Sequence, residues 1–449
     1  MFYDYLINSL GKDSAKQYLY ANEQAIKNIE KIIQEEKIDC DFERQDNYVF
    51  TQNKDEVKKI KKEVEAVNFL GFDTKYLEKI NLPINIKEDA NKKQKNKEQE
   101  INISKPVLAA IKFPNQAQFN SYKYILGLAS KIEENNGKIY ENSKVINLKK
   151  DEDSYIVETE GAKVKAKYVI IASHYPIINF PGFYFMKMYQ ETSYLIAVET
   201  NQELFDGMYI NSEDPTISFR TALYNGKRVL IVGGMSHKTG AKIDLSKAYK
   251  NLENVAKELY PDCKVLFKWN TEDCIPLDKI PYIGEFSNLM PNVYVGTGYK
   301  KWGMTSSNVA ANIITDKILG RENKYEEVFN SKRLKPLKNY EELTNMVKEV
   351  GYSLIINRLK KTDERLGNLK NDEGSIIEVD NQKVGVYKDN KGNIHAIKPY
   401  CTHLGCELSW NNLDKTWDCP CHGSRFNYEG KNLYEPALKD LEKLDILEE

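Results

Sequence analysis

A short pattern of Cys and His near the C-terminus constrains this chain more than any other feature. Cys401 and His403 form a C-x-H pair, Cys419 and His422 form a C-x-x-H pair, and fifteen residues separate His403 from Cys419. Two thiolates and two neutral imidazoles suit a [2Fe–2S] cluster in which two His replace two Cys on one iron. Imidazole carries less negative charge than thiolate, so such a cluster accepts an electron more readily than an all-Cys cluster.

Structural zinc is the main alternative, because two Cys and two His also form a tetrahedral zinc site. Zinc fingers, however, usually pair like with like, as C-x₂₋₄-C and H-x₃₋₅-H. In this chain each short segment contributes one Cys and one His. The mixed pairs therefore favour an iron–sulfur cluster over zinc.

The two segments also resemble a known family. CTHLGC at residues 401–406 and CPCHGS at residues 419–424 are similar to the two cluster-binding loops of Rieske proteins. In Rieske proteins of the cytochrome bc type the matching cysteines form a disulfide, so the resemblance implies a bond between Cys406 and Cys421. Two buried free thiols are the alternative.

The resemblance also bears on the redox potential. Ser424 stands where the family places a hydroxyl that donates a hydrogen bond to a bridging sulfide, and Phe426 stands where the highest-potential members carry Tyr. Hydrogen bonds to cluster sulfurs raise the potential. We therefore expect a midpoint potential inside the Rieske range of roughly −150 to +300 mV, but below its top.

Composition indicates where the chain works. It has 449 residues, enough for two or three domains, and its net charge of −1 provides no general field for nucleic acid or an anionic membrane. Cys40, Cys263 and Cys274 are scattered, which fits a reducing compartment. No apolar run is long enough to span a bilayer, and MFYDYLINSL lacks the basic flank of a secretory signal. We expect a cytoplasmic protein with no membrane-spanning segment and no nucleic-acid partner.

The hydrophobic pattern predicts a mixed region followed by a small all-β domain. Helical spacing predicts helices over residues 13–36, about 120–135 and 338–361, and the polar segment 88–105 predicts a surface insertion. Predicted strands are SKVINL, YIVETE and KVKAKYVIIAS, and TISFRTALYNGKRVLIVGG predicts a hairpin that turns at Asn225-Gly226. From about residue 371 the predicted strands are SIIEV, KVGVYKD and NIHAIKP.

Residues 1–330 resemble FAD-dependent oxidoreductases of the D-amino-acid-oxidase/glycine-oxidase superfamily. The stretches that carry the resemblance, in order, are FPNQAQFNSYKYILGLASKI, KIYENSKVINL, AKYVIIASHYPI, EDCIPLDKIPYIGEF and VYVGTGYKKWGMTSSNVAANII. They match a subgroup in which a flavin domain is fused to a C-terminal Rieske domain. The resemblance implies an α/β (or α+β) flavin domain over residues 1–330, a helical linker over 331–370 and an all-β Rieske domain over 371–449.

The same resemblance implies which residues contact FAD. The backbone of Val145 would contact the adenosine, Ala172 and Ser173 would end the strand that passes the cofactor, and Gly298, Tyr299, Gly303, Met304 and Thr305 would approach the flavin ring before a helix from about Ser306. Glycine lets a backbone approach a ligand closely, and a helix N-terminus stabilises negative charge on a reduced flavin. An ordinary Gly-bearing strand–helix turn is the alternative.

The start of the chain departs from the family pattern. It contains no G-x-G-x-x-G followed by an acidic ribose ligand, the combination that holds the dinucleotide in such enzymes. Since MFYDYLINSLG resembles a point well inside the family domain, we expect the first βαβ unit to be missing. We then expect weak FAD binding, because the strongest phosphate contacts would be absent.

The resemblance implies a flavin- and Rieske-dependent oxidoreductase that takes a hydride from a small amine or amino-acid-like substrate. Its cluster would pass electrons singly between the flavin and a one-electron donor or acceptor, either a protein or a quinone. A Rieske electron-transfer module on a flavoprotein that no longer binds FAD well is the alternative. A Rieske oxygenase does not fit, because His174, His237 and His395 lack the spacing of a 2-His-1-carboxylate iron site.

Three side chains are candidate catalytic residues. Tyr299 stands beside the flavin loop, Arg220 could pair with a substrate carboxylate, and His237 could act as a base. Each also has a structural explanation: a packed tyrosine, a salt-bridged arginine and a structural histidine.

Overall fold

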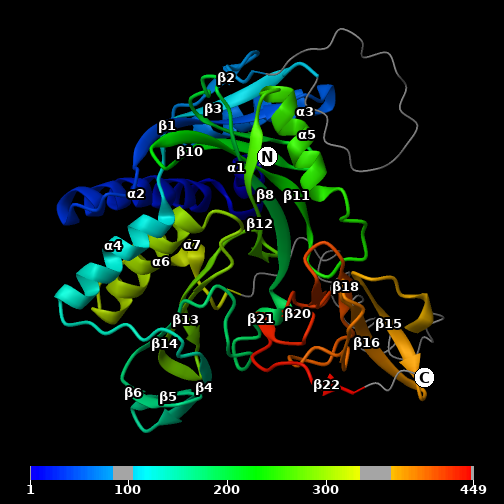
Figure 1. Cartoon of the computed structure of the whole chain (residues 1–449). Coiled ribbons are helices and arrows are strands. Elements are labelled where there is room, and N and C mark those ends of the chain that lie inside the picture. Colours follow the sequence, from blue (N-terminus) through cyan, green and yellow to red (C-terminus); the bar gives the residue numbers. More distant parts are fainter. Residues whose placement is uncertain (1, 84–104, 334–365, 446–449) are drawn as a thin grey trace.

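The computed structural model describes residues 2–83, 105–333 and 366–445. The predicted helix at 338–361 lies outside these residues, the predicted insertion at 88–105 lies almost entirely outside them, and the predicted linker is described only at its ends. An α/β region and a smaller all-β unit make up the described chain. The all-β unit, orange to red in Figure 1, contacts strands β8 (Met188–Glu199) and β12 (Lys264–Pro276) of the α/β region.

The largest element is an eight-stranded sheet of order β12-β8-β11-β10-β9-β1-β3-β2. Only the β1–β9 pair is parallel. Helix α5 (Ala248–Leu259) covers one face, where Phe50, Phe219 and Leu252 belong to a fully buried core. The strands are β1 (Glu43–Thr51), β2 (Lys75–Leu77), β3 (Ala109–Gln118), β8 (Met188–Glu199), β9 (Met208–Asn211), β10 (Ile217–Tyr224), β11 (Lys227–Lys238) and β12 (Lys264–Pro276).

A second layer is built from helices and a three-stranded sheet. In that sheet β14 (Met290–Thr297) lies between β13 (Tyr282–Ser287) and β7 (Val169–Ile171), and it runs parallel to β7. Leu19 of α2 and Ile313 of α6 belong to one buried core. The helices are α1 (Phe2–Leu10), α2 (Lys12–Glu36), α3 (Lys54–Phe69), α6 (Gly303–Ile318) and α7 (Glu326–Phe329).

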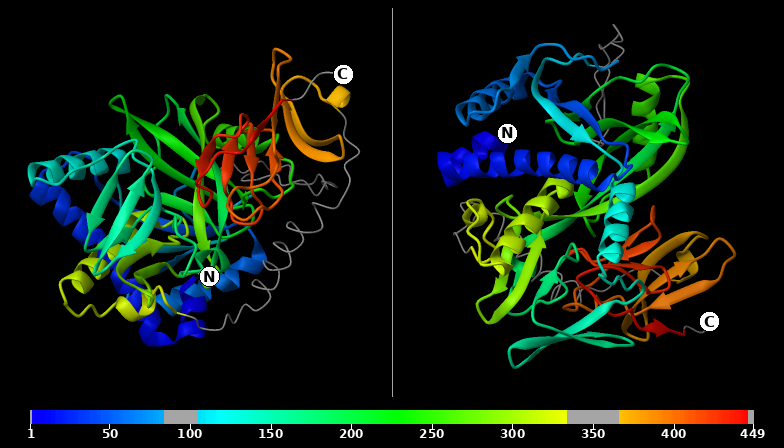
Figure 2. Two further views of the ribbon diagram at one scale, coloured as in Figure 1. Left: turned by 90° about the horizontal axis from the view of Figure 1, so that it is seen from below. Right: turned by 90° about the vertical axis from the view of Figure 1, so that its left-hand side faces the viewer.

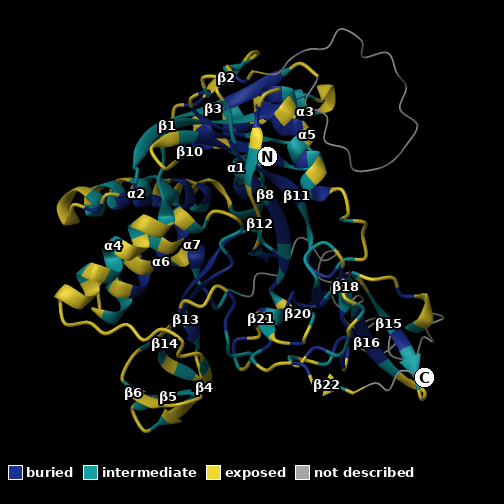
Figure 3. Cartoon of the chain, in the orientation of Figure 1, coloured by how far each residue is buried: buried dark blue, intermediate teal, exposed yellow. Residues whose placement is uncertain are grey.

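A peripheral part of the α/β region is more exposed. Strands β4 (Val145–Asp151), β5 (Ser154–Thr159) and β6 (Lys163–Ala166) form an antiparallel meander. No residue of α4 (Ser121–Glu134) is buried, and Figure 3 shows its surface as largely exposed. The meander lies on the far side of the small sheet from the eight-stranded one (Figure 1), whereas α4 contacts α2.

Most predicted elements of this region are confirmed, and two boundaries are corrected. Helices α2 and α4 match their predictions, and the hairpin turns at Asn225 and Gly226, whose φ values of 48° and 74° suit a tight turn. The predicted strand KVKAKYVIIAS is instead split into β6 and β7, because β6 pairs with the meander and β7 with β14. Helix α6 begins at Gly303, three residues before the predicted Ser306.

The C-terminal unit is all β, as predicted. One sheet contains β15 (Glu373–Val379), β16 (Gln382–Lys388), β17 (Ile394–Ile397) and β22 (Lys443–Leu444). The other contains β18 (Ser409–Asn411), β19 (Thr416–Asp418), β20 (Arg425–Asn427) and β21 (Asn432–Tyr434). Trp417 and Phe426 are fully buried between them, in the same cluster as the cysteines of the motif.

Within the described ranges, no helix combines the length and the apolar character needed to cross a bilayer.

Candidate redox site

The four predicted cluster ligands converge at one point of the all-β unit. Cys401 and His403 lie on the loop before β18, and Cys419 and His422 lie between β19 and β20. The His403 and His422 rings are 4.9 Å apart and nearly perpendicular. The Cys419 thiol hydrogen-bonds the Cys401 sulfur, which lowers the pKa of Cys401.

The ring nitrogens of the two histidines fit a metal cluster. Both Nδ1 atoms are buried and have no hydrogen-bond partner among the described residues. Burial lowers the pKa of His403 to about 4 and that of His422 to about 3, so both rings are neutral near pH 7. A buried nitrogen without a partner is costly unless it binds something. Two paired sulfurs and two unpartnered imidazole nitrogens therefore suit the [2Fe–2S] cluster.

The neighbouring side chains match the Rieske resemblance. Cys406 and Cys421 form a disulfide, which confirms the expectation. Their sulfurs lie within 4.8 Å of the Cys419 sulfur, but they bind each other and are not free to bind iron. The buried Ser424 hydroxyl accepts a hydrogen bond from the Ala437 N–H at 3.0 Å and also hydrogen-bonds Cys401, whose pKa it helps to lower.

The histidine edge of this site faces the α/β region. His403 Nε2 is 2.8 Å from Asn179 Oδ1. The ring of Phe185, in the short 3₁₀ helix η1 (Tyr184–Met186), lies 6.1 Å from the His403 ring and 5.7 Å from the His422 ring. The Gln190 side-chain amide donates to the His422 carbonyl at 3.1 Å. The sequence offered no local signal for these contacts, because they join residues far apart in the chain.

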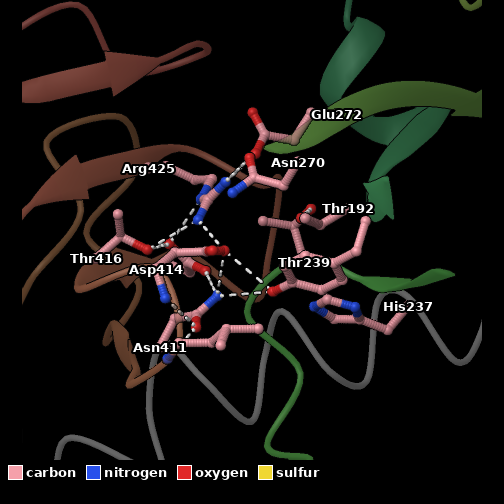
Figure 4. A network of polar contacts seen from close by, with 12 residues as sticks. Thr192, His237, Thr239, Asn270, Glu272, Asn411, Asp414, Thr416 and Arg425 are labelled. Carbon is pink, nitrogen blue, oxygen red and sulfur yellow. Dashed lines mark hydrogen bonds and ion pairs between the residues drawn. The ribbon is translucent and has the colours of Figure 1, made fainter. Parts of the chain in front are cut away.

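A buried polar network fixes the all-β unit to the eight-stranded sheet (Figure 4). Arg425 of β20 pairs with Glu272 of β12, with Asp414 at 2.8 Å and with Asp418 at 3.0 Å. The Tyr194 hydroxyl of β8 donates to Asp414 at 3.0 Å. Burial raises the pKa of Glu272 to about 7, although Arg425 opposes the shift. Because both parts contribute polar or charged groups, this network fixes the position of the all-β unit against the eight-stranded sheet.

Close backbone packing accompanies the network. A Cβ on Gly240, which follows β11, would lie 2.5 Å from the Pro420 nitrogen, and one on Gly423 would lie 2.5 Å from the Gln190 Cβ. Figure 2 shows the all-β unit beside the strands of the large sheet in two further views. Both glycines therefore allow the cluster loop to lie directly against the sheet.

Three residues predicted to contact FAD line a single cavity. Val145, Ala172 and Ser173 border a cavity of about 300 Å³, whose walls are otherwise mostly apolar. Glu435 of the all-β unit also borders it. An apolar cavity with a few polar groups is the usual form of a cofactor site. The cavity thus lies where the flavin region meets the cluster domain.

The predicted flavin loop has the required backbone. Gly298, Lys300 and Lys301 have φ values of 72°, 48° and 67°, and no side chain caps α6 where it begins at Gly303. A Cβ on Gly303 would meet nothing closer than 3.9 Å, so the backbone there is open to a ligand. Met304 is 48% exposed. These features fit a flavin placed against the positive end of a helix.

Thr305 differs from the other residues of this loop. Its hydroxyl donates to the Asn22 side chain of α2 at 2.7 Å, so it joins two helices. Its backbone still belongs to the first turn of α6, where unpaired N–H groups point away from the helix.

The three candidate catalytic residues do not lie together. Tyr299 is folded back, since its hydroxyl would lie 2.5 Å from a Cβ on Gly296, and burial raises its pKa. His237 stacks on Tyr194 at 5.9 Å, on the side of β11 that faces the all-β unit. Arg220 is exposed on the face of β10 opposite to the α5 core.

A group of polar side chains that the sequence did not single out lies on the same face as Arg220. Lys301 Nζ pairs with Glu191 at 2.9 Å and donates to Ser236 at 2.8 Å and to Ser193 at 3.2 Å. The adjacent Lys300 lies 4.3 Å from the Phe2 ring centroid, and burial lowers its pKa to about 8. The tandem lysines of GYKKWG were the available signal.

Fold and site together define a flavin-dependent oxidoreductase that carries a Rieske iron–sulfur domain. Comparison with family models agrees: the FAD dependent oxidoreductase model matches residues 4–317, and the Rieske [2Fe-2S] domain model matches residues 363–445. The chain belongs to the FAD dependent oxidoreductase family, and its cofactors are FAD and a [2Fe–2S] cluster.

Individual relatives show the same combination. YhfW of Bacillus subtilis (strain 168), named as a Rieske 2Fe-2S iron–sulfur protein, is 33% identical over 446 residues, which cover 99% of this chain and 84% of YhfW. Among solved structures, glycine oxidase from Geobacillus kaustophilus has a TM-score of 0.57 at 15% identity, covering 71% of this chain and 83% of its own. L-proline dehydrogenase from P. horikoshii has a TM-score of 0.56 at 16% identity, covering 70% and 82%. These structures share the fold.

Proposed function

We propose that this chain oxidises a small amine that bears a carboxylate, such as an amino acid, and sends the electrons through its Rieske cluster to a one-electron acceptor. The observation that carries the proposal is the contact of His403 with Asn179 at 2.8 Å. It turns the histidine edge of the cluster site towards the flavin region, and Phe185 fills the space beside both rings. This orientation supports electron exchange between the flavin and the cluster inside the chain.

The open face of the large sheet supports this substrate class. Arg220 is exposed on this face and has no carboxylate partner among the described residues. An exposed guanidinium presents a planar pair of N–H donors that a carboxylate can bind bidentately. Arg220 of β10 pairs with Ile231 of β11, which in turn pairs with Ala197 of β8. Ser193, which contacts Lys301, lies about 13 Å from Ala197 along β8. Glycine oxidase and L-proline dehydrogenase, which share the fold, are named for amino acids.

Oxidation of the amine is balanced by the reduction of two one-electron acceptors. When bound, FAD would supply hydride acceptance from the C–H bond beside the amine, and the [2Fe–2S] cluster would supply one-electron exchange. The amine loses two electrons and two protons to become an imine, which water hydrolyses to a carbonyl compound and ammonia or a smaller amine. Two one-electron acceptors, proteins or quinones, remove the electrons.

The chain's own residues then have separate tasks. Arg220 holds the substrate carboxylate, and the paired Lys301 and Glu191 keep the loop beside the flavin in place. Tyr299 and His237 take packing roles, because neither reaches the face that carries Arg220.

The test uses the whole chain, loaded anaerobically with FAD, ferrous iron and sulfide. Glycine, L-proline and N-methylglycine are the probes, and the flavin absorbance and the Rieske EPR signal are both followed. We expect one of these probes to bleach the flavin and to generate the EPR signal of the reduced cluster. If the flavin bleaches while the cluster stays oxidised, or if amines without a carboxylate react as well, the proposal is wrong.

Substitution of Arg220 gives the matching kinetic test. Arg220→Ala should raise KM about 10- to 100-fold with a smaller effect on kcat, because a charge-assisted pair contributes about 1.5–3 kcal/mol. Arg228→Ala is the control: it removes a partly exposed arginine that pairs with Glu43 and Asp206 at the surface. An unchanged KM in Arg220→Ala would remove the carboxylate site from the proposal.

A further inference from the structure

We infer that Asn179 of the α/β region is a positioning residue for the Rieske cluster: it fixes the tautomer of His403 and lowers the midpoint potential from across the domain interface. The inference rests on the cluster alone and not on amino-acid oxidation. The proposed function and this role of Asn179 can therefore fail independently.

The contact is direct and is made by a well-held residue. Asn179 Oδ1 is 2.8 Å from His403 Nε2. The Asn179 carbonyl accepts a hydrogen bond from the Phe183 N–H at 2.8 Å, which closes a turn around it. The segment leading to Asn179 is also fixed, since Ile177 and Ile178 line the cavity together with Ala172 and Ser173. One continuous loop thus runs from the cofactor cavity to a cluster ligand.

The hydrogen-bond chemistry assigns the proton on His403. A neutral imidazole carries one proton, so one nitrogen donates and the other has the lone pair that binds a metal. Nδ1 is the buried nitrogen without a partner, and Nε2 is the one beside Asn179. If Asn179 presented its NH₂ group instead, Nε2 would need the lone pair and Nδ1 the proton, which would prevent ligation. The amide oxygen therefore accepts from Nε2–H.

The hydrogen bond from His403 Nε2–H to Asn179 should lower the redox potential of the cluster. An acceptor on the outer N–H of a ligating histidine makes the imidazole a stronger electron donor to the metal. Stronger donation stabilises the oxidised, more positive cluster, so the potential falls. Asn179 therefore works against the Ser424 hydroxyl, which hydrogen-bonds the sulfur of Cys401 and withdraws charge. The flavin region thus contributes to a property of the cluster that the all-β unit alone would set differently.

The experiment measures midpoint potentials of the full chain, loaded with iron and sulfide, by EPR-monitored titration at fixed pH. Asn179→Leu keeps the approximate size but removes the acceptor, and its potential should lie above that of the wild type. Asn179→Asp presents a stronger, charged acceptor, and its potential should lie below. Asn432→Ala is the control, because it removes the bond between Asn432 and Lys144 at 2.7 Å, another contact across the interface that touches no cluster ligand.

Pulsed EPR on chain labelled with ¹⁵N-histidine supplies the readout that a merely structural role would not move. In Asn179→Leu the nitrogen coupling of one imidazole should change while the other stays as in the wild type. Equal potentials in the wild type, Asn179→Leu and Asn179→Asp would overturn the inference, and so would an Asp variant above the wild type. If Asn179→Leu fails to hold the cluster, the comparison of Asn179→Asp with the wild type decides.

Discussion

Arg425 of β20 and Glu272 of β12 form an ion pair between the two parts of the chain, and their side chains are only 2% and 1% exposed. The pair belongs to a group in which Arg425 also meets Asp414 and Asp418. One guanidinium thus serves three carboxylates at the place where the cluster domain joins the large sheet. Such a group fixes the relative position of the two parts, but the loss of one member leaves a buried charge without a partner and destabilises the fold.

Replacement of Arg425 tests that dependence. Arg425→Met should lower the free energy of unfolding by about 3–5 kcal/mol, because it leaves buried carboxylates without a partner. Chemical denaturation of the loaded chain measures the change. Arg228→Met, at an arginine that is 34% exposed, should cost about 0–1 kcal/mol. Equal small losses in both variants would show that the buried network does not hold the domains together.

Glu272 should make stability depend on pH. Burial raises its pKa to about 7 in the folded chain from an ordinary value of 4.5. Between these two pH values the folded state keeps a proton that the unfolded state has lost, so the contribution of Glu272 to stability is full below pH 4.5 and declines as pH rises through 7.

Glu272→Gln removes this titration and keeps a carbonyl that can accept from Arg425. The difference in unfolding free energy between Glu272→Gln and the wild type should therefore shift in favour of the variant as pH rises from 5 to 8, a range chosen to cross the raised pKa. Urea denaturation at several pH values gives this difference, in which the titrations of all other groups cancel. A difference independent of pH would contradict the assigned pKa.

The cluster site was predictable from the sequence because its ligands are local. Cys401 and His403, and likewise Cys419 and His422, are near neighbours in the chain, and each short loop places its own pair. The loop at Gly298 was also predictable, since a glycine with a φ of 72° is required there by the strand–helix turn. The strands of the C-terminal unit were predictable as well, because the alternation of hydrophobic residues is also a local pattern.

The contacts between the two parts were not predictable in this way. Asn179 and Arg425 look like ordinary polar residues of a loop and a strand, and their partners lie 224 and 153 positions away in the chain. His237 shows the same limit: its sequence context suggested a base, and in the structure its ring stacks on Tyr194, on the face of the sheet opposite to Arg220. Which face a strand residue occupies depends on a register shift between Gly234 and His237 that the pattern does not reveal.

The Ser424 hydroxyl should affect the midpoint potential of the cluster in a defined direction. Its buried hydroxyl hydrogen-bonds the Cys401 sulfur, so Ser424→Ala should lower the midpoint potential. A hydrogen bond of about 1 kcal/mol corresponds to about 40 mV for one electron. Thr402→Val, which removes the exposed hydroxyl bound to the Lys439 carbonyl, is the control. A potential that rises in Ser424→Ala would contradict the assigned direction of the bond.

A substitution at Phe426 should change the midpoint potential in the opposite direction. It is fully buried in the core that contains the cluster cysteines, at the position where the family resemblance places Tyr in high-potential members. Phe426→Tyr should raise the midpoint potential, because the added hydroxyl can donate to a cluster sulfur. A redox titration checks this, and no change or a fall would mean that the hydroxyl points away from the cluster.

Gly240 should be the position where one methyl group does most harm to the junction of the domains. Its φ of 77° already disfavours any other residue, which costs about 1–2 kcal/mol, and its Cβ would lie 2.5 Å from the Pro420 nitrogen. That backbone adjoins the ligand Cys419 and cannot move without moving the ligand. Gly226→Ala is the matched control, because Gly226 has a φ of 74° but nothing within 4 Å of the added Cβ.

The two variants share the backbone cost, and only Gly240→Ala has the collision. We therefore expect Gly240→Ala to lose more unfolding free energy than Gly226→Ala and to bind less iron after reconstitution, whereas Gly226→Ala keeps its iron content. Iron and sulfide analysis, together with the intensity of the Rieske EPR signal, measures the second effect. If both variants hold the same amount of cluster, the approach of Gly240 to Pro420 does not matter for the ligand loop, and the domains have room to separate there.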